Sequence, residues 1–513
     1  MEYNYVHLKG AKCGLDIGDG SERGEYVCQD YMLSVLGRPH RMVNIMYTYY
    51  PKDNEWPQRI SQACKDMEIN FQWDYPYDDY FPYDLDSDEA FNQMRDIRKH
   101  GQDVMLTLTI DCSLEDDELR KVARSFRPFG RMCVRINHEC YGNWFTHNKR
   151  FSYEEIDKFF VRFSRIIKEE APQVRTIFCA GRVEAEPEDG VRLYDALTGE
   201  QKIKCEDEFL ASYNECDIVS ADRYLALHYG WPCDVAEPDD PEGRYYADCV
   251  DKMYEEYKNT YERIRAIAGD KPFIQAEFNT DGDVTGPAEQ GESVLRYYGL
   301  IRDKDEGFIK GISMYQFRDR GRLGLEIEDP NCKSVGIRQP IMDDYMKILS
   351  DPYFSPGFEA AGPVIKEDRP EEKSLLSVII EAAEAAKEED AEIINAKLRW
   401  GSSEDADGIE TIVEMEGNPV FFEVSLAPED SIMIEAGGRW FYKGRGVSTI
   451  DLMPAFFYKN VAQKAKVPIR FFATPPDGEN QDDGSLDHLC NYYTTMKKAP
   501  KFRIRYKAPG AVR

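Results

Sequence analysis

The sequence predicts an α/β protein: a closed (β/α)8 TIM barrel followed by a C-terminal all-β, sandwich-like domain. Between about residue 40 and residue 320, short apolar runs alternate with longer amphipathic stretches, the pattern of repeated βα units around a parallel sheet. After residue 392 the pattern changes to short β-like runs separated by Gly and Pro, which is typical of a sandwich. Eight runs are predicted as barrel strands: residues 42–48, 69–73, 104–110, 132–136, 176–180, 218–221, 273–277 and 309–317.

The stretches between these runs carry helix signals. Ser152 is followed three residues later by Glu155, a capping box, and the apolar residues beyond it recur on one helical face. A second helix is predicted over residues 251–268, with Gly269 as its stop. Eight strands with intervening helices are the parts of a closed barrel, in which chemistry is located at the carboxyl ends of the strands.

Charge and composition exclude several classes of partner. The chain has 513 residues and a formal charge of 65 − 95 = −30, with a sequence pI ≈ 4.8. A nucleic-acid backbone or an anionic membrane would be repelled by such a surface, so neither is expected as a partner. The first ten residues lack the basic and apolar regions of a signal peptide. The chain as written therefore indicates a cytoplasmic protein, or an extracellular one if a leader was removed.

Neither a metal nor a cofactor is predicted. The seven histidines show no HxH or HExxH spacing, and no phosphate-binding, haem or flavin fingerprint is found. Thirteen cysteines, an odd number without a CxxC pair, indicate buried thiols, with Cys133, Cys179 and Cys216 inside predicted strands. The oligomeric state cannot be read from the sequence.

Two predicted strands end in glutamate. The fourth strand leads from Arg135 into Asn137, His138 and Glu139, and the seventh strand carries Glu277 at its end. Strands four and seven face one another across the mouth of such a barrel. A pair of carboxylates held about 5 to 5.5 Å apart is what retaining glycoside hydrolysis requires. The alternative is a structural one, a buried network that Arg135 neutralises.

The stretch Arg135-x-x-His138-Glu139-x-x-Gly142-x-Trp144-Phe145 resembles the acid/base motif of glycoside hydrolase family 26, which belongs to the clan A (β/α)8 barrels. The resemblance extends more loosely over residues 10–325 and includes the stretch from Asp217 to Tyr224. It implies that Glu139 is the general acid/base, Glu277 the nucleophile and Tyr224 the hydrogen-bond donor that orients it. Implied further are Arg135 as the residue that steadies the carboxylates, His138 as a contact of the sugar in the −1 subsite, and Trp144 and Phe145 as a stacking surface.

The sequence departs from the family pattern at two places. Thr146 and His147 follow Phe145 where many members continue with two tryptophans, and Tyr315 stands where strand eight commonly offers a tryptophan floor. We assign Asn137, Tyr315 and Trp73 to substrate binding as well, Trp73 because it opens a loop rich in aromatic and acidic residues. Loop packing is an equally good interpretation of those aromatic residues.

Three segments are predicted: residues 1–365 as the barrel catalytic domain, 366–392 as a linker or helical connection, and 393–513 as a β-sandwich accessory domain. This accessory domain is either a carbohydrate-binding module or a structural sandwich packed on the barrel, and we favour the structural role because aromatic residues in alternating strands usually form a core. The stacking candidates of a module are Trp400, Trp440, Phe441 and Tyr442.

The expected function is a retaining, endo-acting β-glycanase that needs no cofactor and whose partner is a polysaccharide or oligosaccharide. By family frequency, β-1,4-mannan or glucomannan is the leading substrate, followed by β-1,3-xylan and mixed-linkage β-glucan. Two alternatives stay open: a glycan-binding barrel without turnover, and an exo-acting glycosidase on short β-oligosaccharides. Product size and the loss of activity on mutation of Glu139 or Glu277 distinguish the three.

Overall fold

The structure is a computed structural model. It describes residues 1–19, 25–51, 81–140, 145, 147, 150–179, 192–194, 201–203, 209–225, 245–319, 321–364, 392–415, 419–456 and 465–506. The predicted strand at 69–73, Trp73, Trp144 and nearly all of the predicted linker lie outside these residues.

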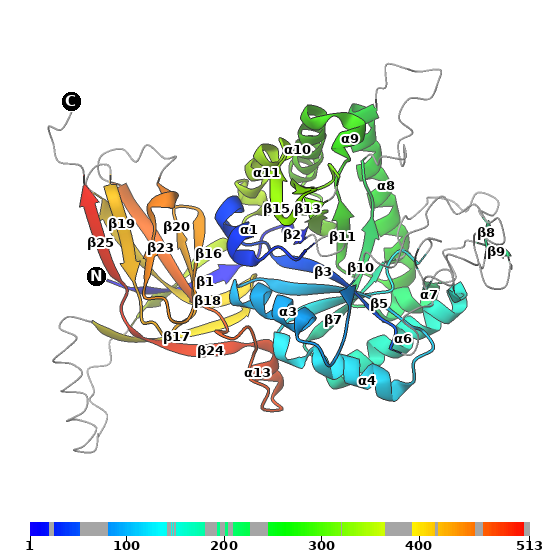
Figure 1. Cartoon of the computed structure of the whole chain (residues 1–513), viewed down its shortest axis with the longest axis horizontal. Helices are drawn as coiled ribbons and strands as arrows, with labels where there is room; N and C mark the ends of the chain where they lie inside the picture. Colours follow the sequence, from blue (N-terminus) through cyan, green and yellow to red (C-terminus); the bar gives the residue numbers. More distant parts are fainter. Residues whose placement is uncertain are drawn as a thin grey trace.

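A closed barrel of eight parallel strands forms the larger part of the molecule (Figure 1). The strands follow one another around the ring in chain order, and β2 closes it by pairing with both β12 and β3. This confirms the predicted (β/α)8 fold. The strands are β2 (Gly14–Gly18), β3 (Met42–Tyr49), β5 (Asp103–Ile110), β6 (Met132–Ile136), β7 (Val174–Cys179), β10 (Ile218–Asp222), β11 (Phe273–Phe278) and β12 (Ile309–Met314).

The predicted strand at residues 42–48 is confirmed as β3, but the start of the ring needs a correction. The ring begins with β2, which the sequence did not predict, and β3 pairs directly with β5 over its whole length. No strand therefore lies between β3 and β5 in the ring, and the predicted strand at residues 69–73 falls outside the described residues. With β2 as the first strand of the ring and β3 as the second, β6 and β11 are strands four and seven as predicted.

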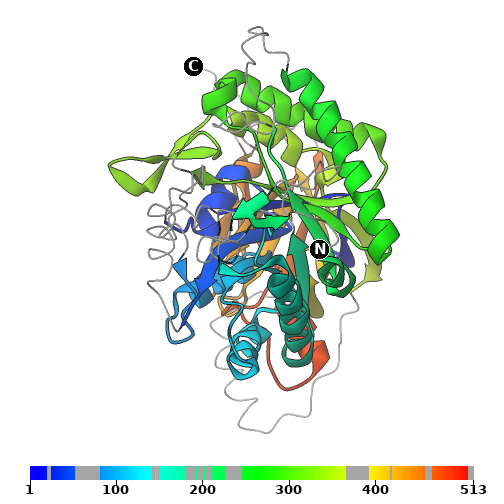
Figure 2. The ribbon, with the colours of Figure 1, turned by 90° about the vertical axis from the view of Figure 1, so that its right-hand side faces the viewer.

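Helices surround the strands on the outside (Figure 2). The capping box at Ser152 and Glu155 is confirmed, and α6 begins directly after it. The helix predicted to end before Gly269 is also confirmed, although it starts at Tyr245 rather than residue 251. The helices are α1 (Gln29–Leu36), α3 (Glu89–Lys99), α4 (Asp116–Ser125), α6 (Tyr153–Glu170), α7 (Leu210–Glu215), α8 (Tyr245–Ala268), α9 (Gly282–Thr285), α10 (Pro287–Lys304) and α11 (Ile341–Leu349).

Several short strands lie outside the ring of eight. Directly after strand eight, β13 (Arg318–Asp319), β14 (Glu326–Asp329) and β15 (Cys332–Arg338) form a small sheet. The pair β4 (Phe81–Pro82) and β3 is parallel, while β8 (Arg192–Tyr194) and β9 (Gln201–Ile203) form a hairpin. No described helix combines the length and the apolar character needed to cross a membrane.

The C-terminal region consists of antiparallel sheets around their own apolar core, as predicted for a sandwich. Strands β1 and β16, both on the barrel side of the predicted boundary at residue 365, hydrogen-bond into the larger sheet, and the division into domains stays a prediction. The larger sheet has β1 (Asn4–Lys9), β16 (Gly357–Pro363), β17 (Ile393–Ser402), β18 (Asp405–Met415), β20 (Ile432–Ala436), β21 (Arg439–Lys443), β23 (Ala465–Ala473) and β24 (Tyr492–Lys498), and the smaller one β19 (Pro419–Ser425), β22 (Thr449–Asp451) and β25 (Lys501–Tyr506).

The C-terminal region packs on the amino-terminal end of the barrel. Its main-chain and side-chain donors bind carbonyls in the loops that lead into strands β3, β5 and β6. The catalytic end of such a barrel is the opposite, carboxyl-terminal one. The bonds are Trp440 N to Gly37 O at 2.7 Å, Thr474 Oγ1 to Lys99 O at 2.6 Å and Asn480 N to Pro128 O at 2.6 Å.

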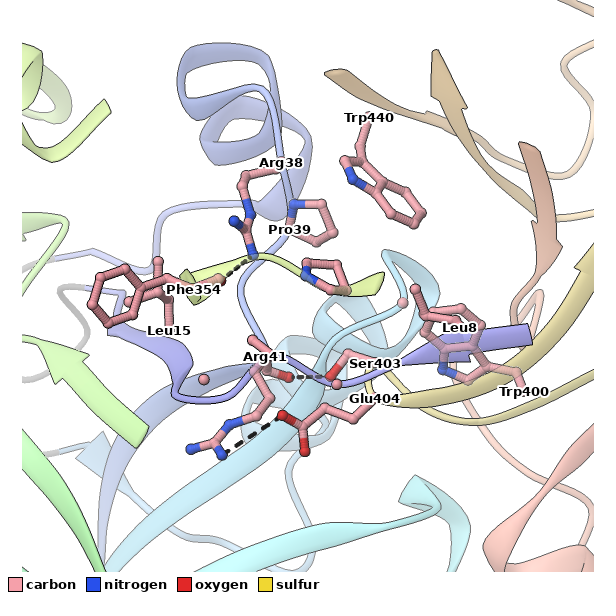
Figure 3. Close-up of a pocket in the computed structure, with 15 residues that line it drawn as sticks. Leu8, Leu15, Arg38, Pro39, Arg41, Phe354, Trp400, Ser403, Glu404 and Trp440 are labelled. Carbon is pink, nitrogen blue, oxygen red and sulfur yellow. Dashed lines mark hydrogen bonds and ion pairs between the residues drawn. The ribbon is translucent and has the colours of Figure 1, made fainter. Parts of the chain in front are cut away.

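Aromatic residues of the C-terminal region are buried in this junction (Figure 3). Trp400 is 2% exposed and Trp440 6% exposed, and both line a small cavity between the two parts of the chain. Nearby, Ser403 Oγ donates to the carbonyl of Arg41 at 2.7 Å, and Glu404 lies 3.8 Å from the Arg41 guanidinium. Because the indole rings of Trp400 and Trp440 lie in the junction between the C-terminal region and the amino-terminal end of the barrel, we assign them to packing.

Candidate active site

Glu277 lies at the carboxyl end of strand seven with both of its oxygens bound. Nη2 of Arg135 donates to Oε1 at 2.5 Å, and the hydroxyl of Tyr224 donates to Oε2 at 2.6 Å. Nε2 of His138 is 3.8 Å from Oε1. The side chain of Glu277 is only 7% exposed. With a donor on each oxygen, the carboxylate is held in one orientation at the end of the barrel.

Arg135 is the centre of a buried charge network. It is completely buried on strand four, and its Nη1 donates to both oxygens of Asp222 at 2.8 and 2.9 Å. Its Nε donates to Thr107 Oγ1 at 2.8 Å. Burial alone would lower the pKa of Arg135, but the charges on Asp222 and Glu277 raise it well above its ordinary value. The guanidinium therefore stays charged and fixes two carboxylates in one geometry.

Asp222 and Glu277 compete for the same positive charge. Burial raises the pKa of Asp222 above its ordinary value, Arg135 acts in the opposite direction, and the charge on Glu277 adds to the rise. Two carboxylates against one guanidinium leave a net negative charge inside the barrel when both are ionised. The three hydrogen bonds from Arg135 to the two carboxylates are what make this burial tolerable, because an unpaired buried charge is strongly destabilising.

The end of strand four turns sharply. Asn137 has φ 45° and Glu139 has φ 53°, a left-handed conformation that is uncommon for residues other than glycine. His138 between them is buried, and burial together with Arg135 and His147 lowers the pKa of its imidazole well below the ordinary value. His138 is therefore neutral near pH 7. Glu139 is half-buried three residues beyond the end of β6.

An apolar cluster lies beside Glu277. It consists of Met46, Phe145, Tyr224 and Tyr315, with Leu323 packed against it. The ring of Tyr315 meets that of Tyr224 edge-on, with centroids 5.6 Å apart. Phe145 contacts the ring of His138 at 4.4 Å between centroids. The cluster therefore brings together side chains from strand ends two, four, six and eight.

The predicted site residues Arg135, Glu277, Tyr224, His138, Phe145 and Tyr315 are thus brought together, and Glu139 directly follows His138. The amide of Asn137 instead binds the main chain of Ile110, accepting from its nitrogen at 2.8 Å and donating to its oxygen at 3.1 Å. This bonding disfavours a role of Asn137 in substrate binding, which stays a prediction. The assignments of Trp73 and Trp144 fall outside the described residues.

The sequence interpretation missed four polar residues around this network. Asp222 ends strand six, so the same rule that selected Glu277 would have found it. Thr107 and Asn44 are polar residues inside otherwise apolar strands, and Thr107 donates to Asn44 Oδ1 at 2.7 Å. Asn279 is fully buried two residues after Glu277. For Thr107 and Asn44 the available signal was a polar residue inside a buried strand, and for Asn279 it was a polar residue directly after the strand of Glu277.

Three residues of the buried network are of the types that bind metal ions. His138, Asp222 and Glu277 offer ligand atoms within 4.8 Å of one another. The guanidinium of Arg135, however, already binds both carboxylates. A metal cation would have to displace that buried positive charge. The network is therefore better described as an arginine-neutralised carboxylate pair than as a metal centre.

Comparison with known proteins leaves membership of family 26 as a resemblance. No protein-family model matches the chain, and a comparison with curated proteins finds no match. An α-L-arabinofuranosidase structure from Thermotoga maritima aligns at 9% identity over 92% of this chain and 100% of that chain, with a TM-score of 0.43. A family 39 glycoside hydrolase from Bacteroides cellulosilyticus aligns at 11% identity over 90% and 81% of the two chains (TM-score 0.38). An endo-β-1,4-mannanase from Thermotoga petrophila aligns at 11% identity over 90% and 97% (TM-score 0.37). The activity therefore has to be argued from the site itself.

Proposed function

We propose that this protein is a retaining glycoside hydrolase that cleaves a β-linked polysaccharide. The observation that carries the proposal is the environment of Glu277, whose two oxygens accept hydrogen bonds from Arg135 and Tyr224 at the end of strand seven. A nucleophilic carboxylate has to be aimed at the anomeric carbon, and these two donors fix its orientation. Glu139 follows strand four, on the other side of the barrel mouth.

In the first step, a carboxylate oxygen of Glu277 attacks the anomeric carbon, and the bond from that carbon to the leaving oxygen breaks. Glu139 gives its proton to the leaving oxygen and becomes a carboxylate. In the second step, Glu139 takes a proton from water, the hydroxide oxygen bonds to the anomeric carbon, and Glu277 leaves. Two inversions at the anomeric carbon give net retention.

Arg135 and Tyr224 act on Glu277 throughout this cycle. Their hydrogen bonds restrict the carboxylate to one orientation before attack. The same bonds stabilise the carboxylate that forms again when the glycosyl-enzyme is hydrolysed. Neutral His138, 3.8 Å from Glu277 Oε1, can exchange hydrogen bonds with a sugar hydroxyl without adding a second positive charge to the site. We assign it to the −1 subsite.

For the substrate, the resemblance to family 26 favours β-1,4-mannan or glucomannan, followed by β-1,3-xylan and mixed-linkage β-glucan. The cluster of Phe145, Tyr224 and Tyr315 suits a sugar, because aromatic rings pack against the C–H face of a pyranose. The acidic chain suits a neutral polymer better than a uronic-acid polymer, which it would repel.

The test is the release of reducing sugar from mannan, β-1,3-xylan, mixed-linkage glucan, β-1,4-xylan and cellulose by the wild type, Glu139→Gln and Glu277→Gln. Glu414→Gln, at an exposed residue of β18, is the matched control. We expect one polymer to be cut, with a loss of several orders of magnitude in either site variant and none in the control. Absence of cutting, or wild-type rates in the site variants, would contradict the proposal.

Azide separates the two roles. With Glu277→Gly, azide can occupy the space of the missing nucleophile and attack once, so a β-glycoside gives an α-glycosyl azide. With Glu139→Ala, azide replaces water in the second step and gives a β-glycosyl azide. The anomeric configuration of the azide, read by NMR, therefore assigns each glutamate to its role, and the opposite pattern would exchange the two assignments.

A further inference from the structure

The segment that follows strand eight returns to the neighbourhood of Glu277. Leu323, between β13 and β14, packs against the cluster that contains Tyr315 and Tyr224, and Tyr224 is the residue whose hydroxyl binds Glu277. Leu323 is only partly buried, so part of its side chain is left facing solvent. Leu323 thus packs on the same cluster that supplies a hydrogen-bond donor to the candidate nucleophile.

Asn279 holds this segment in place. It is fully buried directly after the strand of Glu277, and its Nδ2 donates to the carbonyl of Tyr315 at 2.7 Å and to the carbonyl of Leu323. Its own main-chain oxygen accepts from the nitrogen of Leu225 at 2.9 Å. One residue therefore ties together the chain segments that follow strands six, seven and eight.

A second set of bonds holds the same segment from its other side. Gln290 Nε2 donates to the carbonyls of Thr280, at 2.8 Å, and Arg322. The guanidinium of Arg322 donates to Gln339 Oε1 at 2.7 Å and pairs with Asp283 at 3.0 Å. Because so many hydrogen bonds and an ion pair hold this short segment, the position of Leu323 beside the site is fixed.

We propose that Leu323 is a specificity-determining residue of this site and that Asn279 is its positioning residue. The inference rests on the proposed function. A sugar ring that brings its anomeric carbon to Glu277 has to lie beside the cluster that contains Tyr224, and the branched side chain of Leu323, packed on that cluster, limits the room there. A backbone sugar without a branch fits there, whereas a sugar that carries a side-chain substituent meets Leu323. The site therefore selects unbranched stretches of a β-glycan.

The experiment compares kcat/KM on a linear glycan and on its branched form, namely linear β-1,4-mannan and galactomannan, or the corresponding pair of whichever backbone is cut. Leu323→Ala makes room, and we expect the branched-to-linear ratio to rise about 10-fold, the order of effect of a few methylene groups in a binding site. Leu323→Phe should lower the ratio. Leu210→Ala, at an exposed leucine of α7, is the control and should leave it unchanged.

Asn279→Asp keeps the size of the side chain but replaces both donated hydrogen bonds by repulsion of two carbonyls. We expect it to move the ratio in the same direction as Leu323→Ala and to raise KM for the linear glycan more than it lowers kcat. A purely structural asparagine would lower the melting temperature and leave the ratio unchanged. An active wild type whose ratio none of the three variants changes by more than twofold overturns this inference alone, whereas a wild type that cuts no glycan overturns the proposed function and this inference with it.

Discussion

Tyr224 and Arg135 bind different oxygens of Glu277, the hydroxyl at 2.6 Å from Oε2 and the guanidinium at 2.5 Å from Oε1. The two donors come from strands that lie on different parts of the ring, β6 for Arg135 and the end of β10 for Tyr224. The barrel therefore fixes the plane of the carboxylate as well as its position. This makes the two hydrogen bonds separately testable.

Replacing Tyr224 by Phe removes one hydrogen bond to the carboxylate and keeps the ring that packs on Tyr315. A hydrogen bond to a charged group contributes about 1.5–3 kcal/mol, so we expect kcat to fall about 10- to 100-fold. Tyr261→Phe is the matched control, because it also removes a hydroxyl bound to a carboxylate, that of Asp270, on an exposed part of α8. Equal activities of the two variants would show that Tyr224 does not act on the nucleophile.

Asp222→Asn tests the charge balance around Arg135. The variant loses a carboxylate that accepts two bonds from a buried guanidinium, and breaking a buried pair destabilises a protein by about 3–5 kcal/mol. We expect a lower melting temperature and a lower kcat, because Arg135 then has Glu277 as its remaining carboxylate partner among the described residues.

Asp217→Asn, just before the same strand, is the control for this change. Its carboxylate accepts from the nitrogen of Thr176 at 2.9 Å, a bond that an asparagine oxygen can also accept. The control should keep wild-type kcat and most of the stability. Thermal unfolding and kinetics on the same preparations provide both readouts, and an Asp222→Asn variant as stable and active as this control would contradict the prediction.

The sequence was sufficient to predict which strand ends carry the site. In a barrel, position along the chain fixes position around the ring, so Arg135, Tyr224 and Glu277 had to converge once strands four, six and seven were found. The first strand was missed because Gly14–Gly18 is short and contains Asp16, a buried carboxylate whose partner, Arg41, lies just before β3. A charged residue inside a five-residue strand removes the apolar run by which strands are recognised.

Strands β1 and β16 were missed for a different reason. β1 pairs with residues 405–410 and 357–363, and no local pattern in a sequence specifies partners that distant. The burial of Trp400 and Trp440 follows from the same packing of the C-terminal region against the barrel. Tertiary contacts decide which face of a short strand packs against another part of the chain. The aromatic pattern alone therefore could not distinguish residues buried between two regions from residues that stack on a sugar.

Gly101→Ala tests the packing of that junction. Gly101 has φ 70°, and a Cβ atom there would lie 3.0 Å from Trp400 and 3.1 Å from Met433. Gly269, with φ 82° and no atom within 4 Å of such a Cβ, is a matched control that carries the backbone strain alone. We expect Gly269→Ala to lower the free energy of unfolding by about 1 kcal/mol and Gly101→Ala to lower it by about 1–3 kcal/mol more. Urea denaturation measures both free energies of unfolding. Equal losses in the two variants would show that Trp400 and Met433 can move away from the added methyl group at no cost in stability.

Asp405→Asn tests an ion pair between the C-terminal region and the barrel. Asp405 binds Arg399 of its own region and, at 2.7 Å, Arg131 of the loop before β6. The hydrogen bond from Arg399 is the largest of the influences that lower the pKa of Asp405 to about 2. The pair is partly exposed, so we expect the variant to lose about 1 kcal/mol at pH 7, less than a buried pair would give.

The sign of the pH dependence follows from the lowered pKa. An unfolded aspartate has a pKa of about 3.9, so the stabilisation by Asp405 is complete above that value and is lost as the pH falls through about 2. The difference in free energy of unfolding between wild type and Asp405→Asn should therefore be constant from pH 7 to pH 5 and shrink below pH 4. Asp86→Asn, at an exposed carboxylate between β4 and α3 for which the described residues provide no ion pair, should differ little from wild type at any pH. Urea titrations at each pH give these differences, and a gap between wild type and Asp405→Asn that stays constant down to pH 3 would show that the stabilisation does not depend on the ionised carboxylate.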